Sequence, residues 1–114
     1  MTETARVATH IFIGALRRRV EAEGGTVTIV KRGERDAGAV LLLLRARDGG
    51  VRVMSRASIG DRAAWRELGA VDDERDPALA ESLDRQRRYD PDLWLVELDI
   101  DDPARFIDTG DGVD

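Results

Sequence analysis

The segment with the most chemically active side chains is residues 32–38, Arg-Gly-Glu-Arg-Asp-Ala-Gly. It sets Arg32, Glu34, Arg35 and Asp36 between glycines, which let a backbone bend freely, and such loops on a rigid sheet are common binding positions. Its mixed charge suits a zwitterion, a phosphate or a charged side chain of a partner. The Gly-x-x-x-x-Gly-Lys-Ser/Thr spacing of a phosphate-binding P-loop is absent. We therefore treat it as a candidate binding loop, and the alternative is an ordinary connection with solvated charges.

Trp65 is the second candidate, because it is one of only two tryptophans and is flanked by Arg62, Arg66 and Glu67. A partly exposed tryptophan in such a setting can anchor a protein interface. The alternative is ordinary packing, since large aromatic side chains are well buried on average. Trp94 lies among alternating apolar residues and is expected in the core.

A short basic run, Arg17 to Arg19, lies in an expected helix. Consecutive helical residues point about 100° apart, so the run cannot form one flat patch, and pairing with Glu21 and Glu23 is the simpler expectation. The alternative is an anion or RNA site. It could include further arginines near the second helix, with two aromatic stacking surfaces, namely Arg85, Arg87, Arg88, Tyr89 and Trp94.

The sequence gives little support for a catalytic site or a metal site. The chain has no cysteine and one histidine, which excludes thiolate chemistry and makes most zinc sites and Ser-His-Asp triads hard to assemble. The carboxylates Asp99, Asp101 and Asp102 resemble the start of a calcium loop, but the glycine and glutamate of an EF-hand are missing. His10 is not expected to act as a base. We predict no catalytic residues, no metal site and no cofactor.

Apolar spacing predicts the elements that position these residues. Four-residue spacing of Phe12, Leu16 and Val20 predicts a helix over 9–23, with Thr9 as its N-cap. Strands are expected at 26–31, 39–44 and 51–56, joined as an antiparallel meander. Residues 63–68 have helical propensities but follow a Gly60-Asp61 turn and are short, and a fourth strand is preferred.

The second half of the chain gives clearer signals. Asp76 followed by Pro77 predicts the start of a helix that ends before Pro91. Residues 93–100 form the last strand, apolar on both faces at its start and therefore expected inside the sheet. The sequence predicts one α+β domain over 1–107, an antiparallel sheet of four to five strands with two helices packed on one face. Residues 108–114 are expected to be a frayed polar tail.

The overall composition limits the partners. With 114 residues and a net charge of −5, the chain is not suited to broad nucleic-acid binding, which needs a positive surface. No apolar stretch approaches the roughly 20 residues of a membrane span, and no signal peptide is recognisable, so a cytoplasmic location is expected. An unknown protein partner, a small anion or a second copy in a homodimer are the partners considered.

Four segments resemble a known family: the helix around 11–19, the stretch 32–41, the surroundings of Trp65 and the stretch 89–97 with its Asp-Pro-Asp-Leu-Trp string. They are similar to the alphaproteobacterial domain-of-unknown-function family numbered 1491. The resemblance implies a bacterial cytoplasmic stand-alone domain and brings no activity, cofactor or partner with it.

The leading functional hypothesis is a non-enzymatic protein-interaction or small-ligand-binding module that uses residues 32–38 and the region near Trp65. One alternative is a small enzyme acting on an anionic or nucleotide-like substrate, with Glu34 or Asp36 as acid/base and Arg32 or Arg35 as anion clamp. The second alternative is an RNA-binding accessory protein.

Overall fold

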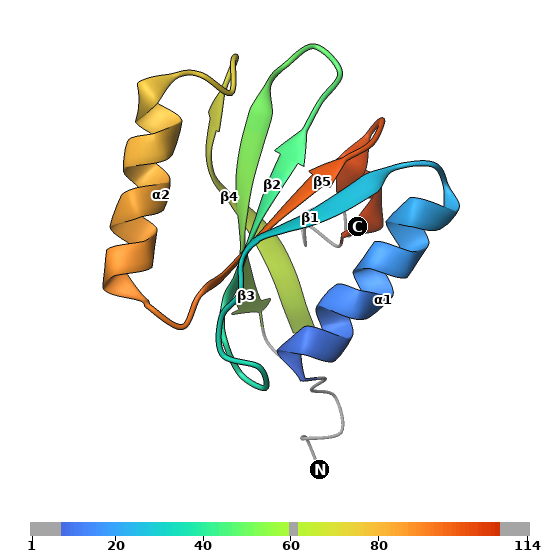
Figure 1. Cartoon of the computed structure of the whole chain (residues 1–114), viewed down its shortest axis with the longest axis vertical. Helices are drawn as coiled ribbons and strands as arrows, with labels where there is room; N and C mark the ends of the chain where they lie inside the picture. Colours follow the sequence, from blue (N-terminus) through green and yellow to red (C-terminus); the bar gives the residue numbers. More distant parts are fainter. Residues whose placement is uncertain (1–7, 60–61, 108–114) are drawn as a thin grey trace.

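The computed structural model describes residues 8–59 and 62–107 and has an α+β fold, as the sequence predicts. Five strands form one sheet, and two α-helices pack against it (Figure 1). In chain order the elements are α1 (Thr9–Ala22), β1 (Thr26–Lys31), β2 (Val40–Arg45), β3 (Val51–Ile59), β4 (Arg62–Val71), α2 (Pro77–Tyr89), β5 (Trp94–Asp99) and the short 3₁₀ helix η2 (Pro103–Phe106).

The sheet has the strand order β1-β5-β2-β3-β4. Strands β2, β3 and β4 form an antiparallel meander, but the expected pairing of β1 with β2 is wrong, because β5 lies between them. It runs antiparallel to β1 and parallel to β2, with Val40 opposite Trp94. Strands β2 and β5 are buried on both faces, and central positions give each of them two neighbours.

The two helices cover opposite faces of the sheet, which corrects the expectation that they share one (Figure 1). Side chains alternate along β2, so Leu42 and Leu44 face the cluster that contains the buried residues of α1, while Leu41 and Leu43 face the cluster that α2 covers through Leu79. A strand that is apolar on both sides needs cover on both sides. The double-sided burial of β2 therefore requires a helix on each face.

Helix α1 presents a narrower apolar stripe than its sequence suggests. Leu16 and Val20 are fully buried, whereas Ile11 is 52% exposed. Thr9 is the first helical residue rather than the N-cap, which is Ala8. The Thr9 hydroxyl instead donates a hydrogen bond of 2.9 Å to the carbonyl of Gly38, which ties the helix start to the 32–38 segment.

The start of α2 follows the prediction closely. The Asp76 carboxylate accepts a hydrogen bond of 2.9 Å from the backbone N–H of Ala78, and Pro77 occupies the first helical position. Helix α2 ends at Tyr89, before Pro91. Within the described residues, neither helix combines the length and apolar composition needed to cross a bilayer.

Residues 63–68 belong to β4, so the preferred strand prediction is confirmed. Strand β4 is an edge of the sheet, and an irregularity in its pairing with β3 falls between Val53 and Met54, opposite Leu68. Such bulges disturb an edge strand and discourage pairing with another chain. The Gly60-Asp61 turn and the predicted frayed tail at 108–114 lie outside the described residues.

Candidate functional site

The 32–38 segment uses Glu34 to build its own backbone shape. One carboxylate oxygen of Glu34 accepts hydrogen bonds from the backbone N–H groups of Asp36, at 3.0 Å, and Ala37, at 2.9 Å. The carbonyl of Glu34 accepts a bond of 2.7 Å from the indole N–H of Trp94. Glu34 therefore holds the loop together and anchors it to the core.

The two glycines let this loop approach β5 closely. A Cβ atom at Gly33 would lie 2.1 Å from the carbonyl oxygen of Asp92, and one at Gly38 would lie 2.6 Å from the same oxygen. These distances are far below van der Waals contact, so a side chain at either position would push the loop away from Trp94. Close packing, rather than mobility, explains the glycines.

The same loop covers the start of α1. Its carbonyls at Asp36 and Arg35 accept hydrogen bonds from the backbone N–H groups of Thr9, at 3.2 Å, and His10, at 3.1 Å. A guanidinium nitrogen of Arg35 lies 3.4 Å from His10 Nε2, while His10 Nδ1 lies 3.1 Å from the Arg35 carbonyl. A histidine protonated at Nδ1 satisfies both contacts. The N–H groups of Thr9 and His10 are thus engaged by the protein itself.

The two remaining candidate residues of this segment, Arg32 and Asp36, also contact other residues. The guanidinium of Arg32 lies 5.6 Å from the ring centroid of Trp94, and a carboxylate oxygen of Asp36 lies 3.9 Å from His10 Nδ1. All four candidate side chains of the loop are exposed. Those of Arg32, Arg35 and Asp36 contact Trp94 or His10, while that of Glu34 binds the backbone of the loop itself. They do not line either of the two hollows described below.

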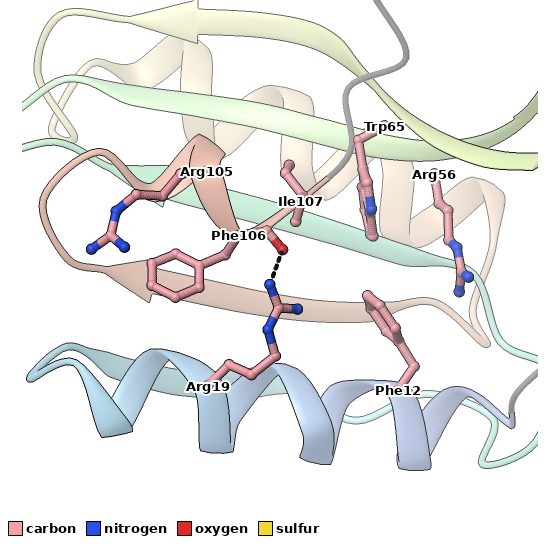
Figure 2. A pocket seen from close by; sticks show the side chains of 7 residues that line it. All are labelled: Phe12, Arg19, Arg56, Trp65, Arg105, Phe106 and Ile107. Carbon is pink, nitrogen blue, oxygen red and sulfur yellow. Dashed lines mark hydrogen bonds between the residues drawn. The ribbon is translucent and has the colours of Figure 1, made fainter. Parts of the chain in front are cut away.

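Trp65 lies elsewhere, in the wall of an open hollow between α1 and the sheet. Its side chain is only 5% exposed, and its ring stacks on that of Phe12 with centroids 5.9 Å apart and planes inclined by 25°. The hollow has a volume of about 450 Å³. It is lined by side chains from α1, β3, β4 and the η2 region, namely Phe12, Arg19, Arg56, Trp65, Arg105, Phe106 and Ile107 (Figure 2).

Three guanidinium groups dominate this hollow, and each lies against an aromatic ring. Arg105 and Arg19 lie 4.4 and 5.7 Å from the ring centroid of Phe106, and Arg56 lies 4.6 Å from that of Phe12. Figure 2 shows Arg105, Phe106, Arg19, Phe12 and Arg56 following one another along the hollow. We call this series the arginine row. Cation–π contacts of this kind hold a guanidinium against the face of a ring.

Arg105 and Arg19 differ in how their positive charge is compensated. Arg105 donates to a carboxylate oxygen of Glu23 at 2.6 Å, and Arg19 donates to the backbone carbonyl of Phe106 at 3.3 Å. Within the described part of the chain Arg19 has no ion pair. The seven lining residues include no carboxylate, imidazole or hydroxyl group. The residues that line the hollow are therefore locally positive, on a protein whose net charge is −5.

The arginines of the basic run at 17–19 lie in different environments in the structure. Arg17 pairs with Glu21 at 3.1 Å, while Arg19 turns into the hollow. The arginines of α2 cannot join them, because α2 covers the opposite face of the sheet. Of the two proposed stacking residues, Tyr89 is 90% exposed and Trp94 is only 2% exposed.

Asp99, the last residue of β5, and Asp101 both lie against arginines. Asp101 pairs with Arg47 at 2.5 Å, and Asp99 lies 3.9 Å from Arg45. Both line a second, smaller hollow of about 390 Å³ that also includes Arg105. Nowhere in the described ranges do three His, Cys, Asp or Glu side chains come together as metal ligands.

Sequence reasoning missed Arg56 and Arg105 as site residues. They are separated by 49 positions and belong to different elements, and neither stands in a recognisable motif. Phe12 is expected from the sequence only as part of the apolar stripe of a helix, and no motif marks Phe106 or Ile107 as site residues. The one usable signal is compositional: positive charge that is almost all arginine, in a chain with few aromatic rings to place it on.

Comparison with known proteins agrees with this fold. A solved structure of a protein from Caulobacter crescentus CB15 is 35% identical, with a TM-score of 0.77 over 89% of this chain and 94% of that chain. The solution structure of protein Atu0922 from A. tumefaciens is 30% identical, with a TM-score of 0.78 over 93% and 96% of the two chains. A search of curated proteins finds no match.

The Caulobacter protein is described as a DUF1491 family protein, and both relatives come from alphaproteobacteria. A family model described as "Protein of unknown function (DUF1491)" matches residues 7–108. The resemblance noted in the sequence is confirmed, and the chain belongs to the DUF1491 family.

Proposed function

We propose that this protein is a non-enzymatic binding module that recognises negatively charged groups in the hollow formed by the arginine row. The observation that carries the proposal is that Arg19 and Arg105 share the ring of Phe106, although two like charges near one ring repel each other. Glu23 compensates one of them. An anion that contacts both guanidiniums would remove the remaining repulsion and form charge-assisted hydrogen bonds.

Binding is favoured over catalysis by the composition of the hollow. A general acid or base must lie within hydrogen-bond reach of the substrate, and none of the seven lining side chains can act as one near neutral pH. The enzyme hypothesis relied instead on Glu34 and Asp36. The carboxylate of Glu34 is engaged by two backbone N–H groups, which argues against a role in proton transfer.

RNA binding is less well supported than anion binding. Base stacking requires an open aromatic face, and the rings that line the hollow are largely covered. Trp65 is 5% and Phe106 is 5% exposed, and guanidiniums lie over Phe106 and Phe12. The rings therefore position charge rather than offer stacking platforms. A homodimer stays a prediction that sedimentation equilibrium can test.

The proposal is tested by NMR titration of the full chain with inorganic phosphate and with pyrophosphate. We expect saturable shifts of backbone amides in η2 and in the part of α1 around Arg19. The Arg19→Gln variant should weaken the affinity about tenfold, the effect of about 1.4 kcal/mol of lost charge-assisted hydrogen bonding.

The matched control is Arg88→Gln, an exposed arginine on α2 at the opposite face of the sheet. It changes the net charge equally and should leave the affinity unchanged. Shifts that do not saturate, or an equal loss of affinity in both variants, would contradict a specific site.

A further inference from the structure

The two edges of the sheet differ in how they are protected against pairing with another chain. Within the described residues, β1 pairs only with β5, and β4 pairs only with β3. An edge strand turns N–H and C=O groups outward, and natural sheets protect such edges with charged side chains or bulges. On β4, Arg66 and Glu67 are exposed, and the irregularity in its pairing lies within the strand. The β4 edge therefore has both kinds of protection.

The β1 edge lacks this protection over most of its length. Residues 26–30 are Thr-Val-Thr-Ile-Val, which are all uncharged and β-branched and favour an extended strand. The one charged residue of β1 is Lys31, and its Nζ donates hydrogen bonds to the carbonyls of Pro91, at 2.9 Å, and Leu93, at 3.0 Å. This lysine is held against its own chain. The irregularity in β1 comes only after Ile29, so the strand before it keeps a regular register.

The surroundings of this edge are apolar or electrically balanced. Val30 is 49% exposed, and Ile29 is only half-buried. On α1, Arg17 and Glu21 are each two residues from Arg19, about 200° round the helix, and so face away from the arginine row. They pair with each other at 3.1 Å. The side of α1 away from the hollow therefore brings no unbalanced charge toward a neighbour.

We propose that β1 is the interface of a homodimer, in which β1 of one copy pairs antiparallel with β1 of a second copy. Two copies with a net charge of −5 each repel one another, so they need a contact that is locally neutral. The uncharged strand at 26–30 meets this need, because it pairs with itself without bringing like charges together. The contact is self-complementary, as a two-fold interface requires, and it joins the two sheets into one.

The symmetry of this pairing also brings the two α1 helices together. A two-fold axis that relates antiparallel neighbouring strands is perpendicular to the sheet, so both α1 helices lie on the same face. Gly14, in the middle of α1, fits a close approach there, because it is about 200° round the helix from Phe12 in the hollow. Glycine destabilises a helix interior relative to alanine. Among the described residues, a Cβ at Gly14 would meet only the guanidinium of Arg18, at an ordinary 3.7 Å, so packing within the chain does not require glycine.

The experiment combines sedimentation equilibrium of the full chain with amide hydrogen exchange at increasing protein concentration. We expect a reversible dimer of twice the chain's 12.6 kDa. The outward N–H groups of β1 should exchange more slowly as the concentration rises, because they become hydrogen-bonded in the dimer. Exchange at the β4 edge should not depend on concentration.

A charge placed on the edge tests the interface directly. Thr28 is exposed and lies opposite Glu97 in the pairing of β1 with β5, so the monomer can accommodate Thr28→Lys beside a carboxylate. In the dimer the two new lysines come close together, and the affinity between copies should fall at least about tenfold. The matched control is Leu68→Lys, which adds the same charge at a position on β4 that is 41% exposed. It should leave the affinity unchanged.

The inference fails if the chain stays monomeric up to about 1 mM, or if it dimerises while β1 exchange is independent of concentration. It also fails if Thr28→Lys leaves the dimer intact, or if Leu68→Lys weakens it equally. Should Thr28→Lys not fold, hydrogen exchange of the unmodified chain still decides. Phosphate binding at Arg19 should be the same in Thr28→Lys, because the hollow lies on the other side of α1, so the proposed function is tested separately.

Discussion

The 32–38 loop and the arginine row contain the same kinds of charged residues, but the fold uses them in opposite ways. In the loop, Glu34 and the glycines fix the backbone against Trp94, and the carbonyls of Arg35 and Asp36 bind the start of α1. In the row, arginines from three separate parts of the chain lie on aromatic rings around an open hollow. The charged side chains of the loop contact nearby backbone groups, His10 and Trp94, whereas the row brings three guanidiniums together around a hollow whose lining residues include no carboxylate.

The largest expected effect is a loss of stability when a glycine of the 32–38 loop is replaced. Gly33→Ala should lower the free energy of unfolding by about 3 kcal/mol, because the new Cβ would meet the Asp92 carbonyl at 2.1 Å and the backbone cannot yield cheaply. Urea denaturation measures it. The control is Gly69→Ala in β4, where a Cβ meets nothing within 4 Å and the cost should stay below about 1 kcal/mol. Equal stability of the two variants would show that the loop is not held by close packing.

Removing the Glu34 side chain tests whether this residue is structural or functional. Glu34→Ala should cost about 1.5 kcal/mol of stability, since the N–H groups of Asp36 and Ala37 lose their acceptor. The affinity for phosphate should not change. Glu81→Ala, an exposed glutamate on α2, is the comparison and should be nearly neutral. If Glu34→Ala lost anion binding but kept normal stability, the 32–38 loop rather than the arginine row would be the binding region.

The Phe106→Leu variant tests whether the aromatic ring positions Arg19 and Arg105. Leucine keeps most of the buried apolar contact, so the stability loss should be about 1 kcal/mol. Loss of the ring frees the guanidiniums of Arg19 and Arg105, and anion affinity should fall about fivefold, equivalent to about 1 kcal/mol. NMR titration with pyrophosphate gives the affinity. An unchanged affinity would mean that the ring does not organise the site.

The smallest effect concerns Asp73 and Arg75, a local pair between β4 and α2. Side-chain hydrogen bonds from Arg75, joined by its backbone N–H, lower the pKa of Asp73 from 3.8 to about 2. A lowered pKa stabilises the fold above pH 3.8, and this contribution is lost as the pH falls toward 2.

Because the pair is solvent-exposed, its effect on stability should be slight. An NMR titration of the Asp73 carboxyl should give a midpoint near 2, and Arg75→Gln should return it toward 3.8. A midpoint near 3.8 in the unmodified protein would show that even this adjacent pair does not form, and would weaken the contrast between local and assembled charges.

Several parts of the fold follow from short segments alone. The Asp76-Pro77 pair marks the start of α2, and the apolar residues of β2 and β5 mark buried strands. The candidate site could not be predicted from short segments in this way. Trp65 was a candidate from its rarity and its charged neighbours, but Arg56 and Arg105 could not be connected with it, because nothing in the intervening sequence says that β3, β4 and η2 meet around α1.

The sequence by itself determined the main helices and strands and the α+β class, because apolar periodicity and capping act over a few residues. Only the tertiary structure decided that β5 separates β1 from β2, that the helices take opposite faces and that three arginines meet in one hollow. Those outcomes depend on contacts between residues far apart in the chain. Such contacts are set by how whole faces pack against one another, and no local pattern records them.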